Sequence, residues 1–205
     1  MDKKKLIVGV TGGLCAGKTT VSKLFSRFGA KVLDADEFSH SALNQPRIKK
    51  RIINLLGEGV VSGGRIDRKK VRQIVFNNKA LLMKLSAAVH PYVKKKMKER
   101  AERCRSELVV WDVPLLIESG MHRSVDVVVL VACGRQQQLR RAKRRGIESG
   151  EALKIINSQM PFSKKRRLAD FIINNNTGID NTEKQARAVF NRLTGGITGG
   201  KNRKG

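Results

Sequence analysis

The segment GVTGGLCAGKTT, which begins at Gly9, constrains the fold of this 205-residue chain more than any other feature of the sequence. Four residues separate Gly12 from Gly17, and Lys18 and Thr19 follow directly, which satisfies the pattern G-x-x-x-x-G-K-[ST]. Backbone N–H groups can converge on phosphate oxygens where no Cβ blocks the approach. The segment therefore predicts a loop that binds nucleotide phosphates. The alternative is a simple strand-to-helix turn with an incidental lysine.

The types of side chain in this loop indicate ATP and Mg²⁺ as its ligands. We expect Lys18 to reach the β- and γ-phosphates and the Thr19 hydroxyl to ligate Mg²⁺. The following helix adds its N-terminal N–H groups and its dipole to the attraction for anions. The residues expected to contact ATP here are Gly12, Gly13, Leu14, Cys15, Ala16, Gly17, Lys18, Thr19 and Thr20.

The hydrophobic pattern around the loop predicts an α/β fold with a parallel sheet. An apolar run over residues 6–10 is typical of a buried strand. Behind the loop the period changes to that of a helix, and a second short strand is expected over residues 31–33. A strand, glycine loop, helix and strand in this order open a three-layer fold of the P-loop NTPase type.

The rest of the chain predicts a helical insertion, a basic lid and a short tail. Residues 57–68 are a glycine-rich interruption of an otherwise helical stretch, and further strands are expected over 108–113, 125–131 and 171–173. The predicted domains are a nucleotide-binding core (residues 1–45, 106–134 and 169–194), a helical substrate domain (46–105), a lid (135–168) and a disordered tail (195–205).

Acidic residues stand at the ends of two predicted strands, where ligands of open parallel sheets bind. A carboxylate in the segment DAD, Asp34 to Asp36, can accept a hydroxyl proton as an acceptor attacks the γ-phosphate. Alternatively, Asp34 or Asp36 caps a helix. Asp112 ends the apolar segment LVVWD and can hold Mg²⁺ through water, or it is a simple turn residue.

Several segments together resemble the dephospho-coenzyme A kinase family, in that family's order. The resemblance extends from about residue 6 to residue 193. The glycine loop is shared by many kinases, whereas the series of the other motifs is much more specific. The matching segments are IVGVTGGLCAGKTTVSKLF, VLDADEFSH, GRIDRKKVRQIVF, HPYV, VVWDVPLLIESG and INSQMPFSKKRRLADFIINN.

This resemblance implies transfer of the γ-phosphoryl group of ATP to the ribose 3′-hydroxyl of dephospho-CoA, the last step of CoA synthesis. It implies Asp36 as the base, with Asp34 beside it, and Arg141 and Arg145 of the lid as phosphate clamps. It also implies that Asn175 lies near the adenine. The residues implied to face the acceptor are Arg68, His90, Leu115 and Glu118, although His90 taken alone is more typical of a capping or core histidine.

The sequence departs from the family at three positions. Cys15 and Ala16 stand where the family usually has glycine and serine, and we hypothesise that Cys15 is prone to oxidation. Gly146 stands where an aspartate often follows the lid arginine. The basic run RRAKRR, residues 140–145, is alternatively a solvated helix face.

The composition limits the remaining possibilities. With 43 basic and 17 acidic residues the net charge is +26, which attracts polyanions. A nucleic-acid-binding protein is therefore one alternative, although aromatic residues make up only 4% of the chain. Another kinase of nucleosides or nucleotides is the second. The three scattered cysteines and the lack of a long apolar run predict a cytoplasmic protein without membrane contact. We expect no obligatory protein partner and only non-specific binding of nucleic acid.

Overall fold

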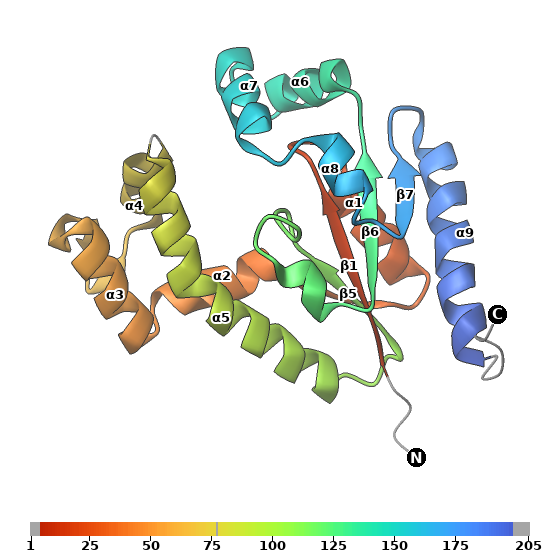
Figure 1. Cartoon of the computed structure of the whole chain (residues 1–205), viewed down its shortest axis with the longest axis horizontal. Helices are drawn as coiled ribbons and strands as arrows, with labels where there is room; N and C mark the ends of the chain where they lie inside the picture. The colour runs from red at the N-terminus through yellow and green to blue at the C-terminus, as the bar shows by residue number, and fades with distance from the viewer. Residues whose placement is uncertain (1–4, 77, 199–205) are drawn as a thin grey trace. The chain divides into compact units, whose positions relative to one another are not determined.

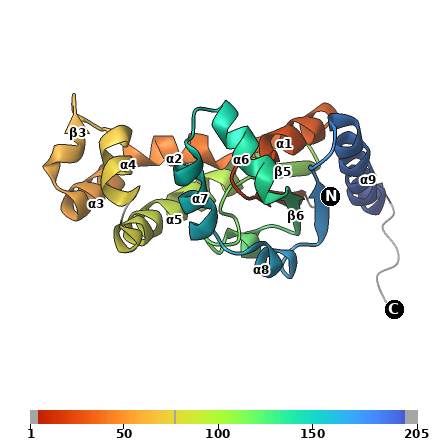
Figure 2. The same cartoon turned by 90° about the horizontal axis from the view of Figure 1, so that it is seen from above.

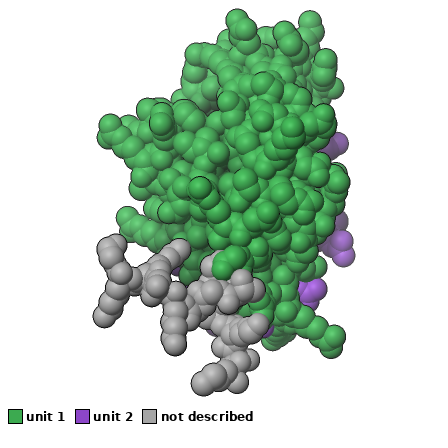
Figure 3. Space-filling view, turned by 90° about the vertical axis from the view of Figure 1, so that its right-hand side faces the viewer, with its two compact units in different colours: residues 1–33, 103–205 green, residues 34–102 purple. Residues whose placement is uncertain are grey.

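The computed structural model describes residues 5–76 and 78–198 (Figure 1). The chain divides into two compact units, of residues 1–33 with 103–205 and of residues 34–102 (Figure 3). The first unit contains the glycine loop and the sheet, and the second is mainly helical.

A five-stranded sheet forms the centre of the first unit. Its order is β2-β5-β1-β6-β7, so that β1, which leads into the glycine loop, is the middle strand. β1 pairs in parallel with β5 and β6, and β6 pairs in parallel with β7. The strands are β1 (Leu6–Gly12), β2 (Lys31–Asp34), β5 (Leu108–Asp112), β6 (Val127–Ala132) and β7 (Phe171–Asn174). The predicted parallel sheet is confirmed.

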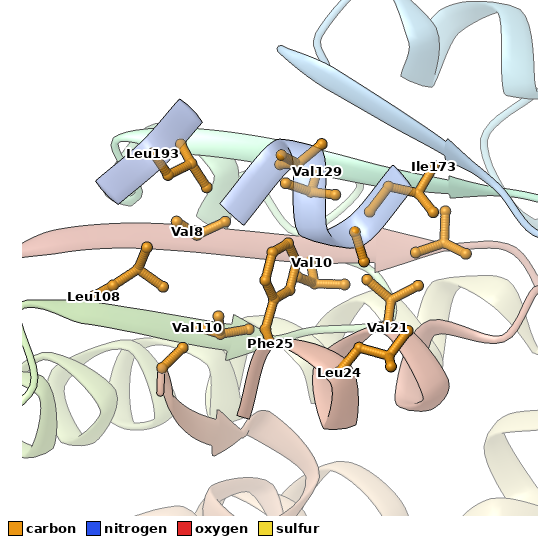
Figure 4. Close-up of a cluster of buried hydrophobic side chains, with 14 of the residues drawn as sticks. Val8, Val10, Val21, Leu24, Phe25, Leu108, Val110, Val129, Ile173 and Leu193 are labelled. Atoms are coloured by element: carbon orange, nitrogen blue, oxygen red, sulfur yellow. The ribbon is translucent and has the colours of Figure 1, made fainter. Parts of the chain in front are cut away.

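Two helices, α1 (Lys18–Arg27) and α9 (Ile179–Thr198), cover one face of this sheet. Phe25 of α1 is fully buried beside Val10 of β1 and Val110 of β5 in the main hydrophobic cluster (Figure 4). The apolar residues of α1 recur at helical spacing, so that burying one face removes them all from water. This packing holds the start of α1 at the end of β1, where the loop lies.

The segment after β5 covers part of the opposite face. Leu116 is fully buried, and a Cβ built on Gly9 of β1 lies only 2.5 Å from its Cδ2 atom. A short 3-10 helix, η2 (Met121–Ser124), ends this segment before β6.

Three helices come between β6 and β7 in the sequence. They are α6 (Arg135–Arg144), α7 (Ser149–Ser158) and α8 (Phe162–Arg166). α6 and α7 pack against each other (Figure 2). These helices span the predicted lid, and they belong to the same compact unit as the sheet.

The second unit consists of four α-helices, a short 3-10 helix and a small hairpin among its described residues. Its elements are α2 (Ala35–Leu43), α3 (Pro46–Leu56), η1 (Glu58–Val60), β3 (Val61–Ser62), β4 (Arg65–Ile66), α4 (Arg68–Phe76) and α5 (Lys79–Arg103), whose last residue is assigned to the first unit. The glycine-rich interruption predicted over 57–68 is thus η1 followed by an antiparallel hairpin.

Two boundaries differ from the predicted ones. The second unit begins at residue 34 rather than 46, because α2 groups with the helical part of the chain. α9 continues through Thr198, beyond the predicted start of the tail at residue 195. The rest of that predicted tail, residues 199–205, lies outside the described residues. Across the part of the chain that is described, no helix is both long and apolar enough for a membrane span.

Candidate nucleotide-binding site

The glycine loop joins the end of β1 to the start of α1. Gly17 is the N-cap of α1 and has a φ of 96°, a conformation that favours glycine. A Cβ at this position also collides with the side-chain amide of Asn175. The N–H groups of Lys18 and Thr19 open the helix and have no intrahelical partner, as at any helix start. They are therefore available to an anion.

Side chains from distant parts of the first unit bond to the carbonyl groups of the loop. Gln138 Nε2 donates to Leu14 O at 2.8 Å, and Asn175 Nδ2 donates to Ala16 O at 2.8 Å. Arg141 Nη1 lies 3.4 Å from Cys15 O and 3.2 Å from Ala16 O. Three successive carbonyl groups are thus satisfied by the protein, which favours a loop whose remaining N–H groups serve a ligand.

Lys18 and Asp112 form an ion pair between Nζ and Oδ1 beside the loop. Their side chains are only 15% and 6% exposed, so that water screens the pair weakly. Asp112 ends β5, next to β1, and the parallel register places it opposite Val10. Both predicted functional side chains therefore meet at one edge of the sheet.

The oxygen donors at this edge fit Mg²⁺ better than a softer metal. Asp112 supplies a buried carboxylate, and Thr19 supplies an exposed hydroxyl in the first turn of α1. Within residues 5–76 and 78–198, no group of three or more His, Cys, Asp or Glu residues could hold a metal by itself. Mg²⁺ commonly binds through one or two protein ligands together with substrate phosphates and water, so the donor set suits it.

A cavity of about 340 Å³ opens beside the loop. The predicted Arg145 and Asn175 line it, together with Arg141. Sequence reasoning missed other residues of its lining, because only the fold brings them here. The lining residues are Cys15, Gly17, Thr20, Arg141, Arg144, Arg145, Asn175, Thr177 and Ile179.

Arg141 and Asn175 both hold other parts of the protein as well as lining the cavity. Arg141 Nη2 donates to Asn175 O at 2.8 Å, in addition to the bonds of its Nη1 atom. The Asn175 carbonyl oxygen Oδ1 accepts from Thr182 Oγ1 at 2.9 Å. Asn175 is only 5% exposed. In the structure these two side chains therefore position the loop through its carbonyl groups.

Cys15 has a φ of 52°, in the left-handed region that a non-glycine residue seldom occupies. Its side chain is buried in a small cluster with Ala142 of α6 and Ala152 of α7. The departure from glycine that the sequence shows is thus accommodated by apolar contacts. The predicted sensitivity of Cys15 to oxidation stays a prediction.

Glu118 lies in the segment after β5 and is engaged by α8. Its Oε1 atom lies 2.6 Å from the Nζ atom of Lys165, which is almost fully buried, and accepts from Met160 N at 3.2 Å. Leu115, which was predicted to face the acceptor, is 40% exposed. Sequence reasoning found Glu118 but not its lysine, because nothing in the spacing of the two residues links them.

The remaining predicted residues, Asp34, Asp36, Arg68 and His90, belong to the second unit. Asp34 is the N-cap of α2, and its Oδ1 atom accepts from Asp36 N at 2.9 Å. The capping alternative is therefore confirmed for Asp34, whereas Asp36 is exposed in the first helical turn. Arg68 is the exposed first residue of α4. His90 lies inside α5, not at a cap, and burial lowers the pKa of its imidazole.

Comparisons with known proteins agree with the resemblance seen in the sequence. The pattern of one family, dephospho-CoA kinase, matches residues 6–181. A dephospho-CoA kinase from Bacillus licheniformis is 39% identical over 192 residues, which cover 90% of this chain and 95% of the relative.

Solved structures show the same fold. A crystal structure of a protein from Thermus thermophilus has a TM-score of 0.82 and 34% identity, and the match covers 93% of this chain and 99% of that one. A dephospho-CoA kinase from Campylobacter jejuni has a TM-score of 0.68 and 25% identity, over 93% and 98% of the two chains. A shikimate kinase from Acinetobacter baumannii, at 16% identity and a TM-score of 0.55, shares the fold alone. The glycine loop, the parallel sheet and these matches together place the chain in the dephospho-CoA kinase family.

Proposed function

We propose that this protein transfers the γ-phosphoryl group of ATP to the ribose 3′-hydroxyl of dephospho-CoA, giving CoA and ADP. The observation that carries the proposal is the loop with its Lys18–Asp112 pair, in a chain that matches the kinase family over residues 6–181. In the reaction, the bond between the γ-phosphorus and the β,γ-bridging oxygen breaks and a bond to the 3′ oxygen forms. The proton of the hydroxyl leaves to a base.

On the donor side, the loop residues Gly12 to Thr20 bind the triphosphate of ATP. Lys18 neutralises charge on the β- and γ-phosphates, and Thr19 and Asp112 hold Mg²⁺. When bound, Mg²⁺ supplies further neutralisation of phosphate charge. Arg141 and Arg145 border the same cavity as Asn175. This shared cavity supports phosphate contacts by the two arginines and a contact between Asn175 and the adenine ring of ATP.

On the acceptor side, Asp36 accepts the proton of the 3′-hydroxyl. It lies two residues after the end of β2, and the carboxyl ends of parallel strands are the edge where ligands of such sheets bind. Asp34 keeps the start of α2 in place through its bond to Asp36 N. Arg68, His90, Leu115 and Glu118 contribute to binding of dephospho-CoA. The protein works in the cytoplasm without an obligatory protein partner, and its basic surface binds nucleic acid only non-specifically.

A coupled assay of ADP release tests this proposal. Dephospho-CoA, adenosine and AMP are compared as acceptors at equal concentration, each with ATP and Mg²⁺. We expect rapid release of ADP with dephospho-CoA alone, and mass spectrometry of the product should show one added phosphate on the ribose. Preference for adenosine or AMP would instead identify another small-molecule kinase. Retention of RNA without any ADP release would favour a nucleic-acid-binding protein.

A further inference from the structure

Leu14 lies in the middle of the glycine loop, and both polar groups of its backbone are bonded to glutamine side chains. Leu14 N donates to Gln159 Oε1 at 3.1 Å, and Leu14 O accepts from Gln138 Nε2 at 2.8 Å. Gln138 belongs to α6, and Gln159 is the C-cap of α7. We propose that Gln138 and Gln159 are positioning residues that hold the backbone of Leu14 and thereby set the loop for the triphosphate. This inference rests on the proposed binding of ATP by the loop.

The chemistry of the two bonds requires a different group at each position. A backbone carbonyl only accepts a hydrogen bond, and a backbone N–H only donates one. Position 138 must therefore supply a donor and position 159 an acceptor. A glutamine amide carries both groups, so its partner fixes its orientation.

Gly13 shows how closely the glutamines approach the loop. A Cβ built on Gly13 lies 2.6 Å from Gln138 Nε2 and 3.5 Å from Gln159 Oε1. The first distance is shorter than a real contact, so a Cβ at this position would displace the Gln138 amide from its place beside Leu14. The P-loop pattern leaves this position open. The bond from Gln138 therefore gives a reason for a glycine that the pattern does not require.

Gln138 is well placed to restrain the loop. It is only 8% exposed, so that water competes poorly for the Leu14 carbonyl. A glycine-rich loop has many conformations available to it, and binding a ligand requires that it adopt one. When the binding conformation is populated only in part, the apparent affinity falls by that fraction. The two glutamines should therefore act on the affinity for ATP more than on the chemical step.

The test compares Gln138→Met with Gln136→Met. Methionine keeps the unbranched shape and removes the donor, and Gln136 is an exposed residue on the same helix. Calorimetry measures the dissociation constant of MgATP in the absence of any acceptor. We expect binding about tenfold weaker for Gln138→Met and unchanged binding for Gln136→Met. At saturating ATP, kcat should change by less than about threefold.

Gln159→Met and the double variant test whether both side chains act through one peptide segment. Because the two bonds hold the same residue, the double variant should lose less affinity than the two single losses multiplied together. Multiplicative losses would show that the two side chains act separately, and this would overturn the proposal.

A purely structural role predicts a different result. In that case Gln138→Met lowers the melting temperature, but the dissociation constant of MgATP, measured at a temperature where the variant is fully folded, is unchanged. That result would also overturn the proposal. Failure of the wild-type protein to bind MgATP would instead contradict the proposed function. Normal binding of MgATP by the wild type without transfer to dephospho-CoA would contradict the acceptor assignment and leave this test intact.

Discussion

At the scale of single residues, Lys18 forms an ion pair with Asp112 in the structure and binds phosphate in the proposed reaction. We expect Lys18→Ala to lower kcat/KM at least about a hundredfold, because the charge on the β- and γ-phosphates is no longer neutralised. The unfolding free energy should fall by about 3 kcal/mol, since Asp112 is left nearly buried without its cation. Steady-state kinetics and urea unfolding measure the two effects.

Lys23→Ala is the matched control for this variant. Lys23 lies on the same helix and is exposed, so its removal should change neither the activity nor the stability. Turnover close to normal in Lys18→Ala, together with a folded protein, would contradict the assignment of the loop as a phosphate site.

Asp36 and Asp34 differ in role although they stand two residues apart. Asp36→Asn should lower kcat at least about a hundredfold and change the dissociation constant of ATP little, because it removes a proton acceptor. Asp34→Asn makes the same change of charge but retains an oxygen that can cap α2, so its effect should be small. An effect of Asp36→Asn on KM alone would indicate a role in binding the acceptor.

We expect His90 to make the free energy of unfolding depend on pH. Burial lowers the pKa of His90 in the folded protein, so the unfolded chain takes up a proton more readily as the pH falls below about 6.5. Stability should therefore be lost as the pH falls from about 7 to 5, and His90→Gln should lose less of it. Urea unfolding at several pH values tests this, with the exposed His40→Gln as the control. Equal losses in the wild type and in His90→Gln would exclude His90 as the cause.

The sequence predicted the residues whose role depends on local pattern. Lys18 and Thr19 follow from the spacing of the loop, and Asp112 follows from the end of an apolar strand. Gln138 could not be found in this way, because it approaches the loop only through the folding of distant elements. Gln159 carried a weak signal, since it lies in the segment SQMP that the family resemblance includes.

At the scale of elements, the pair of Glu118 and Lys165 links the segment after β5 to α8. Lys165→Met should lower the unfolding free energy by about 3 kcal/mol, because it leaves a carboxylate with little access to water. The double variant Glu118→Gln/Lys165→Met should recover most of this loss, since the glutamine keeps an acceptor for Met160 N without the charge. Chemical unfolding measures both variants.

A surface ion pair on another helix provides the control for Lys165→Met. Lys96 and Glu99 lie 2.8 Å apart on α5 with side chains 41% and 31% exposed, so Lys96→Met should cost less than about 1 kcal/mol. No recovery in the double variant would show that the packing of Lys165, rather than its charge, stabilises α8.

The periodic elements were predictable and the short ones were not. α1 and α9 have apolar residues at helical spacing over several turns, and β5 and β6 are nearly continuous apolar runs. The η1 helix and the β3–β4 hairpin are too short for a period to show, so the glycines of that region indicated only a turn. α2 begins within DAD and has no strong apolar stripe, and its start is fixed by the Asp34 cap.

At the scale of the whole molecule, the net charge of +26 should govern how fast anionic substrates arrive. We expect kcat/KM for ATP to fall about three- to tenfold between 50 and 500 mM KCl, because salt screens the long-range field. kcat should change little, since the contacts made after binding are short. Steady-state kinetics across the salt series checks this, with sucrose of equal osmolality as the control. A flat response would show that the basic surface has no part in substrate capture.

The Lys18–Asp112 pair has a consequence for which anions the enzyme admits. Before any substrate arrives, the charges of Lys18 and Asp112 cancel each other within the pair. If Asp112 receives magnesium as proposed, the metal–nucleotide complex brings a counter-charge for each member at once. Sulfate, free phosphate or metal-free nucleotide supplies only negative charge. When such an anion pairs with Lys18, Asp112 is left without a cation and with little access to water. The empty enzyme would thus discriminate among cellular anions by whether they travel with a cation.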